Sequence, residues 1–399
     1  MKKTKRMACV ILAALCLLVQ TGTAQMATNY IDVHVHLRGT TRSGMLGNTG
    51  SPASVPKTPP GPGLRFKQGQ PGSRDLAQKK TKQTQEGNLE TAADNLIKKM
   101  DEYGIQQALV VVVPGPVSNE HEEKSLRQAV MKHPDRLKLM AGGAILSPYL
   151  QNIKPENVTE ADRSRFRQIA TQLLKDGAVG FGEMISYHLS MADHHSFQYA
   201  PPDHPLYLLL ADIAAQNNVA IDLHMEAIVN RRAMPDNLQR ASHKNPKTLE
   251  PTIPAFERLL KQNPKARIVW QHIGWDNTGD MTPELLDRLL SAHPNLYIAL
   301  RIENRTQQVG NGPGMPNRLA DEKGKLKPEW LALIDKFSDR VTIGTDEFFF
   351  PVESEESERP NQSFERTWSL LDQLTPELAQ KIGRDNARRI YSLKQKPRG

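Results

Sequence analysis

Short apolar runs rich in β-branched residues alternate with longer segments of helical spacing along most of the chain. From residue 88 onward, this rhythm is typical of βα units that build a parallel sheet. The chain contains eight runs that we predict to be strands: Ile31–Leu37, Ala108–Val113, Leu137–Ile145, Ala178–Glu183, Val219–His224, Arg267–His272, Leu296–Ile302 and Val341–Thr345.

The number of predicted strands favours an α/β fold of the closed-barrel type. Eight parallel strands, each followed by a helix, form a (β/α)₈ TIM-like barrel of about 250 residues plus insertions. An open doubly wound sheet is the alternative, but no Gly-rich phosphate-binding turn follows the first strand. We therefore predict a single barrel domain over residues 25–399.

A long polar segment interrupts the pattern directly after the first strand. Residues 38–87 contain SPASVPKTPPGPG and then a run rich in lysine and glutamine. Loops of this length are either functional lids or disordered, and the low hydrophobicity favours disorder. Two later loops, 184–203 and 225–252, would rise from the same face of the barrel.

The first 24 residues have the features of a secretory signal. Basic residues precede the apolar run Met7–Val19, and small residues precede a cleavage site after Ala24. The apolar run is too short to span a bilayer as a helix. We therefore predict an exported protein, periplasmic or secreted, without stable membrane insertion. Both cysteines, Cys9 and Cys16, lie in this leader, so the mature chain would form no disulfide.

The charge of the chain gives little support for a nucleic-acid partner. The formal net charge is +8, and loss of the four basic residues of the leader leaves +4. Nucleic-acid-binding domains are usually more strongly basic. A small-molecule substrate is the expected partner, and a homo-oligomer remains open.

The first predicted strand, within NYIDVHVHLRG, carries polar residues at alternate positions. Alternate side chains share a face, so Asp32, His34 and His36 should point into the barrel. Polar groups there are costly unless an ion or hydrogen bonds satisfy them. His34 and His36 are therefore candidate metal ligands, with satisfied core histidines as the alternative, and Asp32 would orient a ligand or make a structural hydrogen bond. The apolar residues between them should face the helices: Ile31, Val33, Val35 and Leu37.

Further polar residues fall at the carboxyl ends of other predicted strands. Glu183, His224 and His272 end the fourth, fifth and sixth strands, and Asp346 follows the eighth. This rim is where barrel active sites are built. The joint pattern predicts one site that draws on most of the barrel.

Residues near this rim are candidates for contacts with a substrate. Arg301, on the seventh predicted strand, could bind a substrate carboxylate or phosphate, and a salt bridge with Glu303 or Glu183 is the alternative. Three histidines in the loop after the fourth strand lie within reach of the barrel mouth, although a solvated loop would explain them equally: His188, His194 and His195.

These motifs resemble those of a known family. The stretch DVHVH, the histidines that close the fifth and sixth strands and the aspartate after the eighth are similar to the metal-dependent amidohydrolase superfamily. The segments YAPPDHPLYLLLADIAAQNNVAIDLHME and IGRDNARRIYSL particularly resemble its amidohydrolase-related branch, which also contains decarboxylases. The resemblance covers nearly all of the mature chain except the insertion.

The resemblance implies a divalent metal site. His34, His36 and Asp346 would bind the ion, with Zn²⁺ expected and Mn²⁺ or Fe²⁺ as alternatives, and Asp346 would also accept the proton of the attacking water. With one ion, His224 would be a further ligand and His272 an acid or base. With two ions, Glu183 would bridge them, and His224 and His272 would hold the second. Glu183 could instead pair with a basic residue at the rim.

The function that follows is an exported metal-dependent hydrolase. It would use a metal-activated water to cleave an amide, lactone or other ester bond of a small organic molecule. One alternative is a metal-dependent non-oxidative decarboxylase, which would share the same ligand set. The other is a catalytically inactive exported binding protein.

Overall fold

The computed structural model describes residues 30–39, 88–193, 195–302, 316–351 and 362–394 of the 399-residue chain. The predicted leader, nearly all of the predicted insertion, His194 and Glu303 lie outside these ranges.

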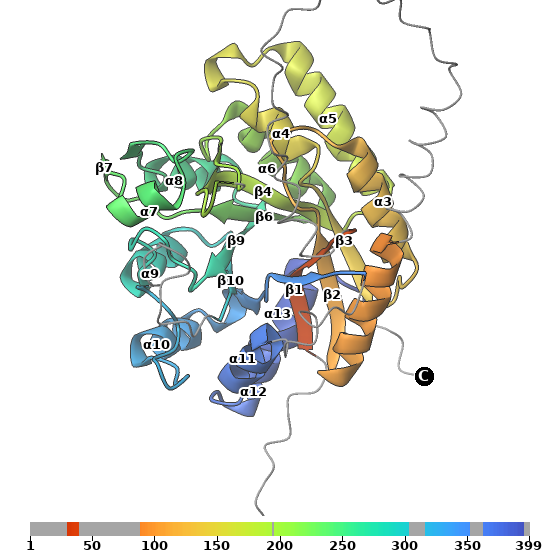
Figure 1. Ribbon diagram of the computed structural model, residues 1–399, viewed down its shortest axis with the longest axis vertical. Helices are drawn as coiled ribbons and strands as arrows, with labels where there is room; N and C mark the ends of the chain where they lie inside the picture. The colour runs from red at the N-terminus through yellow and green to blue at the C-terminus, as the bar shows by residue number, and fades with distance from the viewer. Residues whose placement is uncertain (1–29, 40–87, 194, 303–315, 352–361, 395–399) are drawn as a thin grey trace, which may run out of the picture.

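A curved ten-stranded sheet lies at the centre of the molecule, with helices around it (Figure 1). Neighbouring strands pair in the order β11-β10-β9-β6-β4-β3-β2-β1-β12, every pair on this path is parallel, and β5 adds an antiparallel edge to β4. The strands on the path have these bounds: β1 Tyr30–Leu37, β2 Ile105–Val111, β3 Leu137–Gly142, β4 Gly180–His188, β6 Ala220–Met225, β9 Arg267–Ile273, β10 Leu296–Leu300, β11 Val341–Ile343 and β12 Glu347–Phe349.

The last strand region joins the two edges of this sheet. β11 pairs with β10, and β12, which begins four residues after β11 ends, pairs with β1 through Val35 and Glu347. Between them, the backbone N–H of Asp346 donates to the carbonyl oxygen of His34 at 2.8 Å. The predicted eighth strand is thus divided into two short strands, and the predicted (β/α)₈ barrel is confirmed.

Amphipathic helices cover the outer face of the barrel (Figure 1). A helix over residues 88–102 follows the undescribed segment after β1. The later helices are α3 Glu120–Met131, α4 Leu146–Gln151, α5 Glu160–Lys175, α6 Pro205–Asn217, α7 Asp236–Ala241, α8 Ile253–Gln262, α9 Pro283–Ala292, α10 Pro328–Lys336, α11 Gln362–Leu371, α12 Pro376–Gln380 and α13 Asn386–Ile390. Within the described part of the chain, none of the helices is long and apolar enough to cross a membrane.

Local sequence signals explain where several of these helices begin. Thr159 and Asp162 form a reciprocal capping box at the start of α5. Thr282 accepts a hydrogen bond from the Leu285 N–H at the start of α9, where Pro283 occupies the first helical position. These caps fix the helix starts and therefore the lengths of the loops that precede them.

The loop after β4 begins later than the sequence predicts. β4 continues through the predicted end at Glu183 to His188, because Tyr187 and His188 pair with β5, Gln198–Tyr199. The following long loop carries a second small hairpin of β7, Arg232–Ala233, and β8, Thr248–Leu249. Both additions therefore follow the carboxyl ends of barrel strands, β5 after β4 and the β7–β8 hairpin after β6.

The core has two parts that meet across the sheet. Val35 and Leu37 pack outward among helix residues, as predicted. Ile31 and Val33 instead pack in a cluster with residues of several other strands and with α13, which places them inside the barrel. The prediction that Ile31 and Val33 face the helices was therefore wrong. The pairing of β1 with β2 shifts register between Asp32 and Val35, and such an irregularity breaks strict alternation of side chains.

Candidate metal centre

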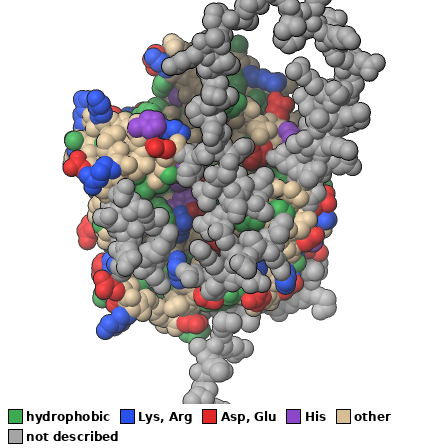
Figure 2. Space-filling view, viewed as in Figure 1, with side chains coloured by type: hydrophobic (Ala, Val, Ile, Leu, Met, Phe, Trp, Pro, Cys, Tyr) green, Lys and Arg blue, Asp and Glu red, His purple; other side chains and the backbone are tan. Residues whose placement is uncertain are grey.

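The predicted ligands from five separate segments converge inside the carboxyl end of the barrel. His34 and His36 lie on β1, Glu183 on β4, His224 on β6 and His272 on β9, and Asp346 lies between β11 and β12. Histidine side chains, with acidic and basic side chains beside them, are visible near the middle of one face of the molecule (Figure 2). The parallel strands bring these residues together because all their carboxyl ends meet at one rim.

One group of potential ligand atoms forms around the histidines of β1. The Nε2 atom of His36 is 3.0 Å from Oδ1 of Asp346, and the Nε2 atom of His34 is 3.8 Å from the same oxygen. One ligand atom from each residue lies within 4.8 Å of the other two. Since both histidines are buried, these three side chains could hold an ion away from bulk solvent.

The Glu183 carboxylate lies between two pairs of histidines. Its Oε1 atom is 2.6 Å from Nδ1 of His224 and 3.0 Å from Nε2 of His272. Its Oε2 atom is 3.9 Å from the Nε2 atoms of both His34 and His36. With His34 and His272, Glu183 forms a second group whose ligand atoms lie within 4.8 Å of one another. Glu183 could therefore share an ion with His34 and His36 or with His224 and His272.

Several ring nitrogens in this cluster lack the hydrogen bonds that burial usually requires. Both ring nitrogens of His34 and the Nδ1 atom of His272 are buried without a hydrogen-bond partner among the described residues. Leaving a buried polar atom unpaired costs about 1–3 kcal/mol. Imidazole nitrogens together with carboxylate oxygens are the donor set that suits Zn²⁺ and related divalent ions. The residues present therefore fit a divalent cation.

The electrostatics of the cluster favour charged carboxylates and a neutral imidazole. Burial raises the pKa of Asp346, but the Arg301 guanidinium and the rings of His272 and His36 outweigh it and hold that pKa well below its usual range. Burial likewise raises the pKa of Glu183, and the neighbouring histidines, led by His224, more than reverse this effect. Burial lowers the pKa of His34 well below its usual range. An ionised carboxylate and a neutral imidazole are the forms in which Asp346, Glu183 and His34 could bind a divalent ion.

Two residues of the cluster have unusual backbone conformations. The φ angles of His272 and Asp346 are +62° and +56°, in the left-handed region that non-glycine residues seldom adopt. Such conformations gather at functional sites, where the surrounding structure holds them in place. Here the hydrogen bond from the Asp346 N–H to β1 fixes the carboxylate beside His36.

Arg301 lies at the rim of the cluster and pairs with Asp346. One guanidinium nitrogen contacts Oδ2 of Asp346, and the guanidinium carbon lies 3.8 Å from the centre of the Trp275 ring. Arg301 therefore pairs with Asp346 and not with Glu183, which contacts histidines instead, and the other predicted partner, Glu303, lies outside the described residues. A substrate contact by Arg301 stays a prediction.

Asp32 makes structural hydrogen bonds and does not orient a ligand ring. Its Oδ1 atom accepts hydrogen bonds from the backbone N–H groups of His34 and Thr345, each at 3.1 Å. Asp32 therefore links β1 to the segment after β11, where the backbone ladder of the barrel is interrupted.

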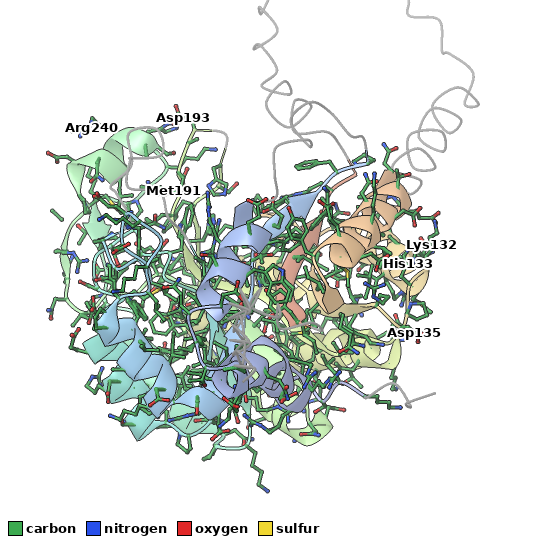
Figure 3. All side chains as sticks on the ribbon, turned by 90° about the horizontal axis from the view of Figure 1, so that it is seen from below. Lys132, His133, Asp135, Met191, Asp193 and Arg240 are labelled. Atoms are coloured by element: carbon green, nitrogen blue, oxygen red, sulfur yellow. The ribbon has the colours of Figure 1, made fainter. Side chains whose placement is uncertain are left out.

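His188 is predicted in the loop after the fourth strand, but it is the last residue of β4, directly before that loop. The His188 ring lies 4.6 Å from the rings of both His224 and His195, so His188 packs onto the cluster and is not part of a solvated loop. The same loop is held to the segment after α7, because Asn245 accepts a hydrogen bond from the Ser190 N–H at 2.8 Å. Figure 3 labels Met191 and Asp193 of this loop and Arg240 of α7, all on the same side of the view.

The fold and the cluster together define a (β/α)₈ barrel with a candidate metal centre at the carboxyl ends of its strands. A family model described as Amidohydrolase matches residues 31–393. The chain therefore belongs to the amidohydrolase family, which confirms the superfamily that the motifs resemble and supports an enzyme of the hydrolase type or a related one. No match was found among curated proteins.

Several solved structures match this chain at low sequence identity. Amidohydrolase 2 from Bifidobacterium longum subsp. infantis is 12% identical, with 92% of this chain and 100% of that chain covered and a TM-score of 0.41. The phosphotriesterase homology protein from Escherichia coli, solved with phosphate, is 9% identical, with 92% and 99% covered and a TM-score of 0.44. N-isopropylammelide isopropylaminohydrolase from Burkholderia multivorans ATCC 17616 is 11% identical, with 92% and 75% covered and a TM-score of 0.39. None is similar enough to transfer a substrate to this chain.

Proposed function

We propose that this protein is an exported metal-dependent hydrolase that cleaves an amide, lactone or other ester bond in a small organic molecule. The observation that carries the proposal is the convergence of His34, His36 and Asp346, with two ring nitrogens of His34 buried and unpaired among the described residues. Membership of the amidohydrolase family supports the reaction class.

The residues that would hold the ion are those of the first ligand group. His34, His36 and Asp346 would bind it, with Zn²⁺ expected, and Glu183 and His224 would complete the donor set. When bound, such an ion acidifies water and polarises the bond to be cleaved. The 3.9 Å distances from Oε2 of Glu183 to both β1 histidines support this assignment.

Asp346 is the proposed acceptor of the proton from the attacking water. Its side chain is 13% exposed, so a substrate at the mouth can approach it. Arg301 neutralises part of its charge at Oδ2, and His36 contacts Oδ1. These contacts fix the carboxylate in one orientation and keep it ionised, as a proton acceptor must be.

His272 is the proposed acid that delivers a proton to the leaving group. Its Nε2 lies 3.0 Å from Glu183, which fixes the proton on that nitrogen, and its Nδ1 lies 3.8 Å from Oδ2 of Asp346. In this proposal the proton passes from Asp346 to Nδ1 and then to the departing nitrogen or oxygen, which requires that substrate binding brings both partners within hydrogen-bond reach of Nδ1.

A substrate panel tests this assignment. Purified protein loaded with Zn²⁺ should release acid from some amides, lactones or other esters, and Asp346→Asn should lower kcat by about 100-fold or more. Asp193→Asn removes an exposed carboxylate that contacts His243 and should leave kcat unchanged. Release of carbon dioxide without hydrolysis would contradict the proposal in favour of a decarboxylase.

Export is part of the proposal and rests on the pattern of the first 24 residues. The mature domain would then comprise residues 25–399. Expression of the full chain with cell fractionation, followed by mass spectrometry of the product, should find a chain that begins near residue 25 outside the cytoplasm. An uncleaved cytoplasmic chain would contradict export.

A further inference from the structure

A buried polar network lies one layer deeper in the barrel than the candidate metal centre. Asp222 lies on β6, two residues before His224, and its side chain has no exposed surface. The Tyr391 hydroxyl donates to Oδ1 of Asp222 at 2.7 Å. The Gln271 side-chain amide donates to the Tyr391 oxygen at 3.3 Å. Tyr391 directly follows α13, so the end of the described chain closes the inside of the barrel.

Two atoms of this region are left unpaired and face each other. The Oδ2 atom of Asp222 and the Nδ1 atom of His34 are both buried and have no hydrogen-bond partner within the described ranges. They lie 4.0 Å apart. A carboxylate oxygen accepts hydrogen bonds, and an imidazole N–H donates one, so the two atoms are chemically complementary. Each would relieve the other of the cost of burial without a partner.

The backbone around these two side chains leaves little freedom for other arrangements. A Cβ atom added at Gly182 would lie 3.0 Å from Cβ of Asp222, and one added at Gly344 would lie 2.8 Å from Cβ of His34. The backbone of β4 therefore comes close to Asp222 at Gly182, and the segment after β11 comes close to His34 at Gly344. The pair is held on both sides by backbone, and Tyr391 fixes the first oxygen of Asp222.

We propose that Asp222 is a positioning residue that accepts the Nδ1–H of His34 through Oδ2, leaving Nε2 of His34 as the ligand atom, and that Tyr391 holds Asp222 for this task. This inference rests on the proposed metal site. The Nε2 atom of His34 is the one that faces Glu183 and Asp346. Asp32 does not fill this role, because its contacts with His34 are to the backbone.

A histidine that binds a metal through one nitrogen usually donates the other N–H to a carboxylate or carbonyl group, which fixes the tautomer and the ring orientation. Removal of such a partner typically weakens metal binding by 10–100-fold. Tyr391 would act only through Asp222, so its removal should have no further effect once Asp222 is changed.

The test compares Zn²⁺ affinity among full-chain variants by competition with a chromophoric chelator. We expect Asp222→Asn to bind Zn²⁺ about 10–100-fold more weakly than the wild type, and Tyr391→Phe to bind it about fivefold more weakly. The double variant should bind Zn²⁺ as weakly as Asp222→Asn alone. If the two substitutions were independent packing defects, their separate losses of Zn²⁺ affinity would multiply instead. The absorption spectrum of bound Co²⁺ should change in Asp222→Asn, because the orientation of a ligand ring changes.

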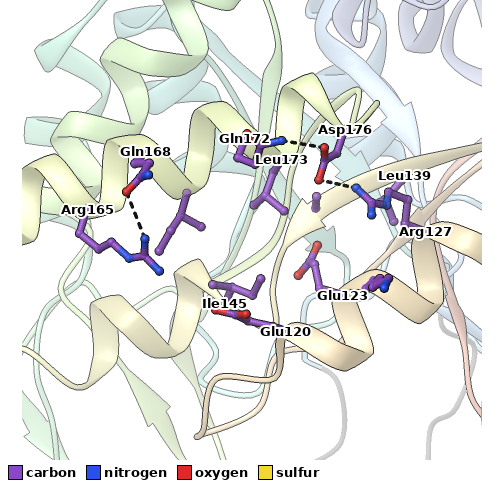
Figure 4. Close-up of a pocket in the computed structure, with 13 residues that line it drawn as sticks. Glu120, Glu123, Arg127, Leu139, Ile145, Arg165, Gln168, Gln172, Leu173 and Asp176 are labelled. Atoms are coloured by element: carbon purple, nitrogen blue, oxygen red, sulfur yellow. Dashed lines mark hydrogen bonds and ion pairs between the residues drawn. The ribbon is translucent and has the colours of Figure 1, made fainter. Parts of the chain in front are cut away.

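Glu123→Gln is the matched control, since it also replaces a buried carboxyl group by an amide. Glu123 lies on α3 and lines a groove between α3 and α5, outside the barrel (Figure 4). This variant should keep the wild-type affinity and the Co²⁺ spectrum. Circular dichroism checks that each variant is folded. If Asp222→Asn does not fold, the Zn²⁺ affinity of Tyr391→Phe still tests the positioning role.

The outcomes separate this inference from the proposed function. A wild-type protein that binds no Zn²⁺, or a His34→Ala variant that binds it as tightly as the wild type, would overturn the metal site itself. A wild-type protein that binds Zn²⁺ while Asp222→Asn or Tyr391→Phe retains its affinity and its Co²⁺ spectrum would overturn the positioning role alone.

Discussion

Gly344 lies where the segment after β11 comes close to His34, so its replacement by alanine is an informative perturbation. The residue follows β11, and its N–H donates to the Leu300 carbonyl at 3.0 Å, which fixes its position against β10. An added Cβ would lie 2.8 Å from Cβ of His34 and 3.4 Å from Oε1 of Gln271. The first contact involves an atom fixed to the backbone of β1, so it cannot be relieved by a side-chain rotation.

The size of the effect follows from these contacts. Relief of the clash to an ordinary van der Waals distance requires β1 or β11 to move by roughly half an ångström, and such overpacking costs about 1–3 kcal/mol of the free energy of unfolding. Ligand distances in metal sites are held to within about 0.2 Å. A displacement of His34 larger than this tolerance should lower Zn²⁺ affinity by at least about tenfold in Gly344→Ala.

Urea denaturation of the metal-free protein and chelator competition measure the two effects separately. Gly115→Ala is the control, because its added Cβ would meet only the Val117 carbonyl oxygen at 3.7 Å, an ordinary contact. That variant should keep both its stability and its Zn²⁺ affinity. If Gly344→Ala also retained both, the close approach of β11 to His34 would not matter to the site, and the reasoning would be refuted.

Two further predictions concern charges. Burial raises the pKa of Glu123 to about 7, so the native state favours the protonated carboxyl group. The free energy of unfolding should therefore fall by up to about 3 kcal/mol as pH rises from about 4.5 through about 7. Urea titrations at pH 5 and pH 8 should show this fall in the wild type and not in Glu123→Gln, and an unchanged pH dependence in the variant would contradict the prediction. Arg301→Met removes the cation that lowers the pKa of Asp346, so the acidic limb of kcat/KM against pH should move to higher pH, and an unshifted limb would exclude that role.

The main features of the site could be predicted from the sequence because they depend on a simple geometric rule. His224, His272 and Asp346 fall at the ends of apolar runs, and in a barrel of parallel strands all such ends meet at one rim. The rule needs only the count and order of the strands. It therefore brought together residues more than 300 positions apart, such as His36 and Asp346.

The details that depend on local irregularity or on side-chain partners could not be predicted in this way. The register shift in β1 turned Ile31 and Val33 inward, and no residue in that stretch marks the shift. The pairing of Arg301 with Asp346 depends on side-chain positions that periodicity does not give. Asp222 is different, since alternation along β6 places it on the same face as His224, and this signal was available in the sequence.

The central claim is that this barrel holds a divalent ion on His34, His36 and Asp346. Elemental analysis of the protein purified without chelator tests it directly, with the double variant His34→Ala/His36→Ala as the reference. We expect at least one ion, predominantly zinc, per wild-type chain and almost none in the variant, whose circular dichroism spectrum should match the wild type. A correctly folded wild-type protein that stays metal-free after incubation with Zn²⁺ would contradict the account.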